Sequence, residues 1–377
     1  MTDSHYDIPC TLGLEEVLAK ELLALRARDV KTRRGGVTCT GDKALGYRAC
    51  LWVRSGVRVQ ELLAEFDARD EQSFYDQIHA LPWEDWMGVD DTLAVDATVR
   101  DSVLTHSGFA AVRTKDAICD RFREREGKRP SVQKDNPTLP LKLRFVKGRV
   151  HLARDLAGES LHKRGYRPVQ VKSPLNEATA AGLLLLAGYD GTGLFVDPMC
   201  GSGTFLVEAA WIAMDRAPGL DRRFACQRWP DFDRVLWNEL VSEALGRVRY
   251  DVDARFVGAD RHPGAVALAG QSFGAAEVGE ITRVEKGELD TWRPKQSPRW
   301  VFTNPPWGER LTEGVDETWD ALAGFLRDCP GTTAHVLSGD PELTKRLRMK
   351  ADQRWPVRNG PIDCRFLRYM VHDRTLS

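Results

Sequence analysis

Residues 173–377 alternate between apolar strands and helices, and this alternation restricts the fold more than any other feature of the sequence. Short apolar segments such as GLFVD (193–197), ARFVGAD (254–260) and RWVFT (299–303) end in polar or glycine-rich turns, and helices lie between most of them. The pattern is typical of a parallel sheet covered by helices on both faces. We therefore predict an α/β fold for residues 175–377, with a doubly wound, mostly parallel, Rossmann-like sheet. Ligands of such sheets bind beyond the carboxyl ends of the strands, so a site is expected there.

The first 157 residues show an α+β pattern that lacks a glycine-rich phosphate loop. Apolar spacing predicts helices over 14–25, 71–86 and 112–127, strands over 35–42 and 91–100, a helix running into a strand over 44–66, and a strand pair over 139–156. Residues 158–174 are polar and interrupted by proline, and we predict a linker there. Residues 217–240 are predicted to be an insertion that follows a catalytic-domain helix.

Composition excludes several classes of protein. The chain has 54 Lys and Arg against 55 Asp and Glu, which excludes a wholly basic nucleic-acid binder but permits a local basic face. The longest apolar run, 180–189, is too short to span a bilayer, and the N-terminus has no secretory pattern. Eight cysteines form no CxxC pair, and HExxH is absent. We expect a soluble, monomeric protein of a reducing compartment, the cytoplasm, without a structural metal.

The segment FVDPMCGSGTF (195–205) places Asp197 at the end of an apolar strand and puts Gly201 and Gly203 in the turn before a helix. Glycines let the backbone approach a ligand, and the helix N-terminus favours negative charge. No GK[ST] follows, so this is not a P-loop, and Leu206 departs from the dinucleotide fingerprint, which disfavours an oxidoreductase. A strand-end acid before GxG suits a nucleoside with an amino-acid tail, whose ammonium group Asp197 can accept. That ligand is S-adenosylmethionine; a purely structural turn is the alternative.

Two further strand ends offer contacts to such a nucleoside. ARFVGAD ends at Asp260, which can accept hydrogen bonds from both ribose hydroxyls or cap the following helix. In VEKGELDTW (284–292), Glu288 and Leu289 lie where a loop reaches the edge and face of an adenine. Taken singly, each of these two is more often a solvated loop residue.

The strand RWVFT ends in Asn-Pro-Pro-Trp, a sequence that can continue neither a strand nor a helix. A nucleobase amino group is a poor nucleophile, and acceptors for its two N–H bonds stabilise the nitrogen as it becomes tetrahedral in the transition state. Asn304 offers a side-chain carbonyl and Pro305 a backbone carbonyl with a fixed φ, while Pro306 keeps Pro305 out of the helical region. Trp307 offers a flat face for base stacking, which contributes about 1–3 kcal/mol. We predict a pocket for a planar amine or amide; a proline-rich strand exit with a packed Trp is the alternative.

Residues 113–149 form a locally basic segment in this nearly neutral chain. It contains 12 Lys and Arg and 5 Asp and Glu, so its net charge is 12 − 5 = +7. Such a segment fits RNA phosphates, and LHKRGYR (161–167) extends it; a solvated helix face is the alternative. A base inside a duplex cannot reach the pocket, so the target is expected to be flipped out or unpaired. The predicted RNA contacts are Arg113, Lys115, Arg121, Arg123, Arg125, Lys128, Arg129, Lys163 and Arg164.

DPMCGSGT followed by NPPWGERL resembles the class I S-adenosylmethionine-dependent amino-methyltransferases. GLEEVLAKEL, VRTKDAICDRF, GESLHKRGYR, the run 197–220 and NGPIDC, in this order, resemble the amino-terminal half of the bacterial 23S rRNA guanine-N2-methyltransferases of the L type. The resemblance implies a ferredoxin-like segment (1–60), a THUMP RNA-binding domain (61–157), the linker (158–174) and a catalytic domain (175–377). It also implies S-adenosylmethionine as cofactor and N2-methylguanine in 23S rRNA as product. The second methyltransferase of the enterobacterial form is not expected here.

The resemblance also assigns roles to single residues. Glu177 matches a family helix near the methionine end of the cofactor, although an exposed helix position explains it equally well. The family usually has Tyr where this chain has Trp307, so the stacking face is kept and a hydroxyl is lost. The predicted cofactor contacts are Glu177, Asp197, Pro198, Gly201, Gly203, Asp260, Glu288 and Leu289, and the predicted catalytic pocket is Asn304, Pro305, Pro306 and Trp307.

Other functions stay open at this point. The same pocket could methylate adenine N6, in DNA for instance, or a glutamine side chain, although the basic segment argues against a protein substrate. A tRNA guanine-N2-methyltransferase shares the expected layout. A non-catalytic RNA-binding ribosome-assembly factor is a further alternative, which the intact motif residues disfavour. Carbon-5 pyrimidine methylation needs a cysteine in the pocket, whereas Cys200 lies in the glycine loop.

Overall fold

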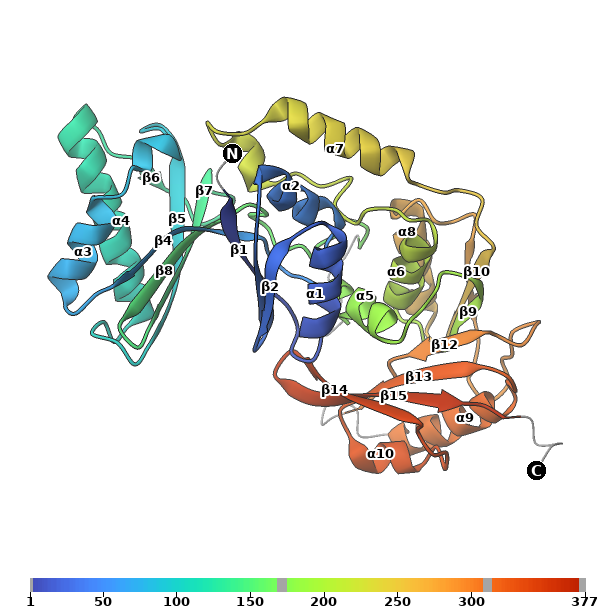
Figure 1. The fold of residues 1–377 in the computed structure, drawn as a ribbon. Coiled ribbons are helices and arrows are strands. Elements are labelled where there is room, and N and C mark those ends of the chain that lie inside the picture. The colour runs from blue at the N-terminus through green and yellow to red at the C-terminus, as the bar shows by residue number, and fades with distance from the viewer. Residues whose placement is uncertain (1–2, 168–174, 308–313, 373–377) are drawn as a thin grey trace.

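The structure is a computed structural model that describes residues 3–167, 175–307 and 314–372. The last part of the predicted linker, 168–174, and the end of the NPPWGERL motif, 308–311, lie outside the described residues. The described residues contain an eight-stranded and a seven-stranded sheet, each covered by helices (Figure 1). Within the same ranges, no helix has the length and apolar character that a membrane crossing requires, and no group of His, Cys, Asp and Glu is arranged to hold a metal ion.

The first sheet runs without a break through the whole N-terminal half, in the order β2-β3-β1-β4-β8-β7-β5-β6. Its centre is β4 (Gln60–Asp67), which pairs with both β1 (Ser4–Pro9) and β8 (Arg149–Asp155). The other strands are β2 (Arg28–Arg33), β3 (Gly36–Gly41), β5 (Thr92–Arg100), β6 (Ser131–Val132) and β7 (Leu139–Val146). Because β4 pairs with β1 on one side and with β8 on the other, the two predicted N-terminal regions, 1–60 and 61–157, are joined by backbone hydrogen bonds as well as by the chain.

Four helices cover this sheet in two pairs (Figure 1). α1 (Glu15–Ala24) and α2 (Lys43–Trp52) pack near β1 and β3, and α3 (Glu71–His79) and α4 (Ser107–Glu126) pack near β5. The expected helix over 71–86 is shorter in the structure, and residues Trp83–Asp85 form a separate 3-10 turn. Pro82 explains the interruption, because proline lacks an N–H and disfavours helical geometry in the residue before it.

The second sheet has the order β11-β10-β9-β12-β13-β15-β14, which is 3-2-1-4-5-7-6 when these strands are numbered within their own domain. Its parallel strands are β9 (Gly193–Asp197), β10 (Ala254–Asp260), β11 (Thr282–Lys286), β12 (Trp300–Thr303) and β13 (Thr333–Ser338). β15 (Ile362–Met370) runs antiparallel to both β13 and β14 (Gln353–Asn359). The predicted α/β class with a mostly parallel sheet is confirmed.

Helices bury both faces of this sheet in separate cores. α5 (Glu177–Leu186), α6 (Thr204–Ala213) and α8 (Pro263–Ala275) contribute to one core. α9 (Val315–Arg327) and α10 (Pro341–Lys345) contribute to the other. The inner strands are apolar on both faces for this reason, as GLFV and WVF are.

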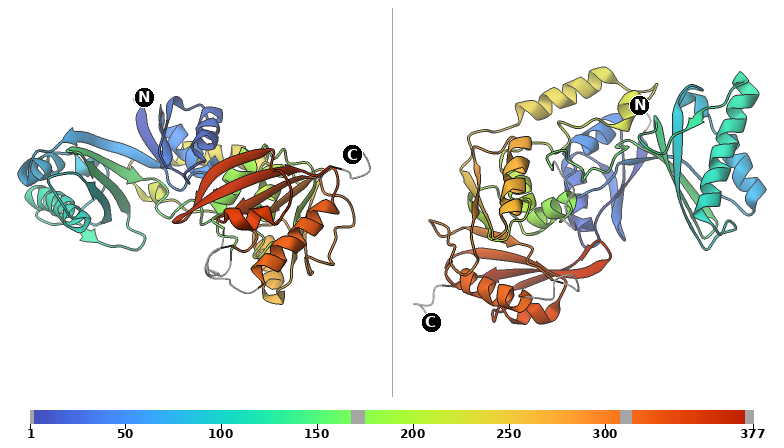
Figure 2. Two further views of the ribbon diagram at one scale, coloured as in Figure 1. Left: turned by 90° about the horizontal axis from the view of Figure 1, so that it is seen from below. Right: turned by 180° about the vertical axis from the view of Figure 1, so that it is seen from behind.

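The chain between α6 and β10 leaves the catalytic domain and packs on the N-terminal sheet. It forms the 3-10 turn Ala225–Arg228 and α7 (Arg234–Gly246), which runs beside α2 (Figure 2). Trp229 donates its indole N–H to the Thr138 carbonyl at 2.8 Å and lies under the Arg154 guanidinium, which pairs with Asp231 at 2.8 Å. Tyr47 packs against the rings of Phe232 and Trp237. These contacts fix the two sheets relative to one another.

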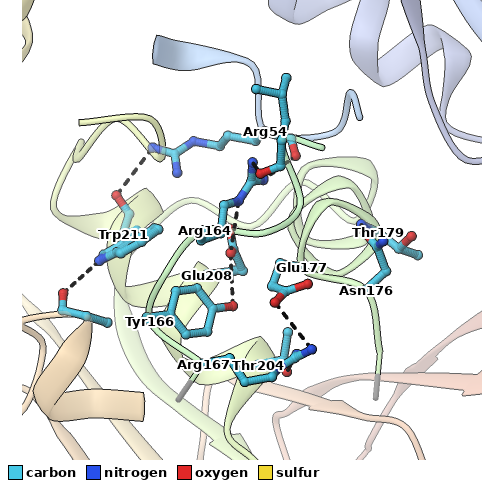
Figure 3. Close-up of polar contacts among 12 residues, drawn as sticks. Arg54, Arg164, Tyr166, Arg167, Asn176, Glu177, Thr179, Thr204, Glu208 and Trp211 are labelled. Atoms are coloured by element: carbon cyan, nitrogen blue, oxygen red, sulfur yellow. Dashed lines mark hydrogen bonds and ion pairs between the residues drawn. The ribbon is translucent and has the colours of Figure 1, made fainter. Parts of the chain in front are cut away.

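Residues 158–167, the described part of the predicted linker, alternate between buried and exposed positions. Leu161 and Tyr166 are buried, and Arg164 donates to the Leu161 carbonyl at 2.8 Å and to the Arg54 carbonyl. Arg164 also faces Glu208 of α6 at 3.5 Å, and the Tyr166 hydroxyl donates to the same carboxylate at 3.1 Å (Figure 3). This segment therefore joins the N-terminal sheet to the helix that follows the glycine loop.

Candidate active site

The strand order reverses between β9 and β12, and the two sequence motifs follow these neighbouring strands. In open α/β sheets, ligands bind in the crevice outside such a reversal. The glycine loop after β9 and Asn-Pro-Pro-Trp after β12 therefore lie side by side at the edge where a ligand is expected.

The glycine loop has the backbone conformation that its sequence predicts. Gly201 and Gly203 have φ values of 54° and 80°, in the left-handed region that disfavours other residues. A Cβ on Gly203 would also lie 2.6 Å from Cε1 of Phe273. Asp260 holds the loop from the next strand, because its Oδ2 accepts the Gly201 N–H at 3.0 Å. Its Oδ1 accepts the N–H of His262, which is the residue that precedes α8, so Asp260 is not itself the helix cap.

Asp197 lies at the end of β9 and is buried, with 3% of its surface exposed. The pKa of its carboxyl is raised to about 7, chiefly by burial and also by nearby Asp260, although the N–H of Met199, at 3.1 Å from Oδ1, acts in the opposite direction. A buried carboxyl with no cation beside it in the described chain suits a positively charged ligand group, which would restore its ionised form.

A cavity of about 420 Å³ opens beside these strand ends. It brings together residues from four of the predicted segments, because strand-end loops after β9, β10, β11 and β12 all contribute to its wall. The predicted site residues that line it are Pro198, Asp260, Glu288, Leu289, Asn304 and Pro306. Its volume and its acidic rim fit a nucleoside.

Two tryptophans hold Asn-Pro-Pro-Trp in place. The Trp307 indole N–H donates to Oδ1 of Asn304 at 3.0 Å, and the Trp319 indole N–H donates to the Pro306 carbonyl at 2.9 Å. The Asn304 oxygen keeps one lone pair for a ligand, and the Pro305 carbonyl accepts no hydrogen bond from the described residues. Trp307 is half-buried and packs on Gly339, where a Cβ would lie 2.6 Å from its ring. The indole therefore orients the amide as well as offering a flat face.

Glu177 and Arg167 form a second, mostly buried polar group next to the glycine loop (Figure 3). Arg167 lies 3.3 Å from Glu177, and it donates to the hydroxyl of Thr204, the first residue of α6, at 2.7 Å and to the Leu175 carbonyl at 3.1 Å. Burial raises the pKa of Glu177. Arg167 Nε and Glu177 Oε2 are buried without a partner among the described residues. Arg167 is not among the predicted site residues. The sequence signal that could have identified it is its position at the end of the basic stretch LHKRGYR.

The predicted RNA contacts are separated by the structure into two groups. On α4, acids from outside the basic segment neutralise several cations: Arg113 pairs with Glu71 at 2.8 Å, and Arg121 pairs with Glu84 at 2.9 Å. The remaining paired cations are Lys115 with Asp116, Arg123 with Asp120, Arg125 with Glu84 and Lys163 with Glu159. Lys128 and Arg129 are exposed and pair with no described residue.

The prediction for Arg164 is wrong. Its side chain is 1% exposed and is held by Glu208 and two backbone carbonyls, so it cannot reach an RNA phosphate. The polar sequence around Arg164 favoured an exposed side chain, whereas in the structure Arg164 neutralises the buried carboxylate of Glu208 on α6.

The strand order 3-2-1-4-5-7-6, the glycine loop and the Asn-Pro-Pro-Trp turn beside it define a class I S-adenosylmethionine-dependent methyltransferase. The chain belongs to the family of RMKL-like methyltransferase domains, whose model matches residues 164–368. A THUMP domain model matches residues 68–155, and the RlmL ferredoxin-like domain model matches residues 7–60. The predicted resemblance is confirmed.

Curated relatives match almost the whole chain. The ribosomal RNA large subunit methyltransferase K/L of Syntrophotalea carbinolica is 39% identical over 96% of this chain and 53% of its own length. The protein of the same name from Cellvibrio japonicus is 37% identical over 98% of this chain and 51% of its own length. The chain spans about half the length of these relatives.

Solved structures share the complete architecture. SMU.472, a methyltransferase complexed with SAH, is 26% identical with a TM-score of 0.89, over 99% of both chains. A Listeria monocytogenes protein described as an N6-adenine-specific DNA methylase is 28% identical with a TM-score of 0.88, over 98% of this chain and 96% of its own. TrmN from Thermus thermophilus, at 17% identity and a TM-score of 0.73 over 98% and 99%, shares the fold.

Proposed function

We propose that this protein transfers a methyl group from S-adenosylmethionine to the exocyclic N2 of a guanine in 23S ribosomal RNA. The observation that carries the proposal is the pair of acceptors after β12, the Asn304 amide oxygen and the Pro305 carbonyl, beside a nucleoside-sized cavity. The names of the curated relatives and the THUMP match support a large-subunit rRNA substrate. Lys128 and Arg129 remain the candidate THUMP contacts to RNA phosphates.

The residues of the site fit the cofactor. Asp197 would accept the ammonium group, and Asp260 keeps lone pairs for the ribose hydroxyls. Glu288 and Leu289 line the cavity where the adenine would lie. The unpartnered Nε of Arg167 would hold the carboxylate of the amino-acid tail, next to Glu177. When bound, the cofactor supplies an electrophilic methyl group on a sulfonium.

The chain's own groups would activate the target nitrogen. The Asn304 oxygen and the Pro305 carbonyl accept its two N–H bonds, which concentrates the lone pair on nitrogen as it becomes tetrahedral. The Trp307 and Trp319 hydrogen bonds keep both acceptors in place before the base arrives. The face of Trp307 is available for stacking on a base that has left its helix.

Cofactor binding is expected to depend on pH through Asp197. Because the pKa of its carboxyl is about 7 without ligand, affinity for S-adenosylhomocysteine should fall about tenfold per unit below pH 6. Above about pH 8 it should fall again, since the ligand's own α-amino group then loses its charge. Titration calorimetry from pH 5 to 9 measures this dependence. The control ligand is 5′-methylthioadenosine, which lacks the amino-acid tail, so its affinity should fall at neither low nor high pH. A flat profile for both ligands would remove Asp197 as the ammonium partner.

Arg167→Met is expected to weaken S-adenosylhomocysteine binding by about 10- to 100-fold, the scale for truncating one partner of a hydrogen-bonded charge pair. Binding of 5′-methylthioadenosine should change by less than about threefold, because that ligand has no carboxylate. Arg167→Lys should restore part of the difference, and Lys163→Met, at an exposed cation four residues away, serves as the matched control. Equal losses for both ligands would instead indicate a general structural role for Arg167.

Methylation of adenine N6 is the second candidate, and the likeness to the Listeria monocytogenes protein favours it. One experiment separates the two. The gene is deleted, rRNA and tRNA are digested separately, and the methylnucleosides are quantified by mass spectrometry before and after complementation. We expect N2-methylguanosine to fall in 23S rRNA alone; loss of N6-methyladenosine, or loss from tRNA, would replace the proposal with the corresponding alternative.

A further inference from the structure

A second cavity, of about 640 Å³, shares no lining residue with the nucleoside cavity. Its wall includes Gly339, on which the Trp307 ring packs, together with Ser338 and Asp340 after β13. The face of β14 and β15 that carries Arg358 and Arg365 forms another wall. The Asn-Pro-Pro-Trp turn therefore touches both cavities, lining the first through Asn304 and Pro306 and packing through Trp307 on Gly339 of the second.

The N-terminal domain completes this second cavity. Leu12 and Gly13, in the turn before α1, line it and pack directly on β14. The Arg358 N–H donates to the Leu12 carbonyl at 3.0 Å, and a Cβ on Gly13 would lie 2.2 Å from the Pro356 carbonyl oxygen. Gly13 has a φ of 93°, so this close approach depends on glycine. The cavity is thus built by both sheets at a rigid contact.

The chain around this cavity is strongly basic. Residues 345–368 contain 8 Lys and Arg and 2 Asp and Glu, a net charge of 8 − 2 = +6. Unlike most of the α4 cations, four of these are exposed and pair with no described residue: Arg348, Lys350, Arg354 and Arg365. Arg365 lies across from Pro356 on β14 and from Ser338 on β13, and all three residues line the cavity. Arg358 lies beside it, with its Nε 3.8 Å from Asp363.

We propose that this second cavity binds the unpaired RNA nucleotide adjoining the target nucleotide, with Arg365 and Arg358 on its phosphate. The inference rests on the proposed RNA substrate. A flipped or unpaired target base at Trp307 leaves its neighbour within one nucleotide of the same indole. Arg365 is exposed and pairs with no described carboxylate, so a bidentate contact to phosphate displaces no ion pair there. Arg358 would exchange its long contact to Asp363, at 3.8 Å, for the phosphate. The strand would thereby touch the Leu12–Gly13 turn as well as the catalytic domain.

The test measures how the protein binds single-stranded RNA at different salt concentrations. A fluorescein-labelled 12-nucleotide single strand is titrated with the intact protein between 50 and 300 mM salt by anisotropy. Arg365→Gln should weaken single-strand binding about 3- to 30-fold at the lowest salt, and it should reduce the slope of log K against log salt by about 0.7, the value for one lost phosphate contact. The double variant Arg358→Gln, Arg365→Gln should lose about twice that slope.

Arg283→Gln is the matched control, since Arg283 is an exposed arginine on β11 that pairs with no residue in the described ranges, and β11 is the opposite edge of the same sheet. It should change neither affinity nor slope, and all variants should bind S-adenosylhomocysteine as the wild type does. Photo-crosslinking of 4-thiouridine RNA should label peptides that contain residues 12–13 or 358–365. Slopes equal to that of Arg283→Gln, together with cross-links elsewhere, would overturn the inference. Altered slopes in a protein that methylates no rRNA would overturn the proposed function and leave this site standing.

Discussion

Asn304→Ala is expected to lower turnover by on the order of 10²- to 10³-fold while leaving cofactor affinity unchanged. The magnitude is that of removing one transition-state hydrogen-bond acceptor or donor from a preorganised site. Affinity is expected to stay because the proposed contacts to the amino-acid tail and ribose of the cofactor come from Asp197, Asp260 and the glycine loop, and Asn304 is proposed to contact the target base instead. Single-turnover methylation of rRNA from the deletion strain measures the first effect, and calorimetry with S-adenosylhomocysteine measures the second.

Trp307→Phe separates the two roles of the tryptophan. Phenylalanine keeps an aromatic face but cannot donate to Asn304 Oδ1, so we expect turnover to fall about 3- to 10-fold, the scale of one neutral hydrogen bond. Trp307→Ala, which loses both features, should approach the loss seen for Asn304→Ala. If Asn304→Ala turns over as the wild type does, the amide has no part in the reaction.

Asp197→Asn is expected to abolish most cofactor affinity and to stabilise the ligand-free protein. Affinity should fall by about 100-fold or more, because the ammonium loses a desolvated charge partner. The amide is nearly isosteric with the carboxyl and has no charge to bury. At pH 8 the free energy of unfolding should therefore rise by about 2–4 kcal/mol, up to the equivalent of a shift from 3.8 to about 7.

The pH dependence of that stabilisation has a definite sign. The carboxyl of Asp197 has a higher pKa in the folded than in the unfolded protein, so the folded state holds an extra proton between about pH 4 and pH 7. Its contribution to stability consequently falls as the pH rises through this window. Denaturation of wild type and Asp197→Asn should give equal stabilities near pH 4 and the full difference above pH 7. If the difference in unfolding free energy between wild type and Asp197→Asn is constant across this range, the buried charge of Asp197 is not the cause of the stability change.

Much of the catalytic half could be predicted from the sequence, because strand-end chemistry is local. The positive φ of Gly201 and Gly203 follows from the need for glycine in a tight turn, and the order of strand-end motifs places Asp197, Asp260 and Asn304 near one edge. The packing and the hydrogen-bond partner of each side chain could not be predicted from the sequence. Whether Trp307 stacks, packs or donates depends on Gly339, which is 32 residues away and carries no motif.

Charge was the property that the sequence described least well. A count over residues 113–149 omits Glu71 and Glu84, which come from other elements and neutralise Arg113 and Arg121. The same limitation hid Arg164, since its partner Glu208 lies 44 residues away on a helix that looked wholly apolar. The basic face of β14 and β15 went unnoticed for the opposite reason, because its cations are spread over two strands that become neighbours only in the folded hairpin.

The insertion between α6 and β10 gives the molecule a fixed span. Trp229, Arg154 and the Tyr47–Trp237 contact hold the insertion against the THUMP-bearing sheet, and the insertion continues at both ends into the catalytic domain, through α6 and β10. For the proposed RNA substrate, this arrangement predicts that methylation depends on the distance between the RNA segment bound by the THUMP domain and the target base. Adding or deleting two base pairs between these two points of the substrate should lower methylation more than changing the bases that flank the target.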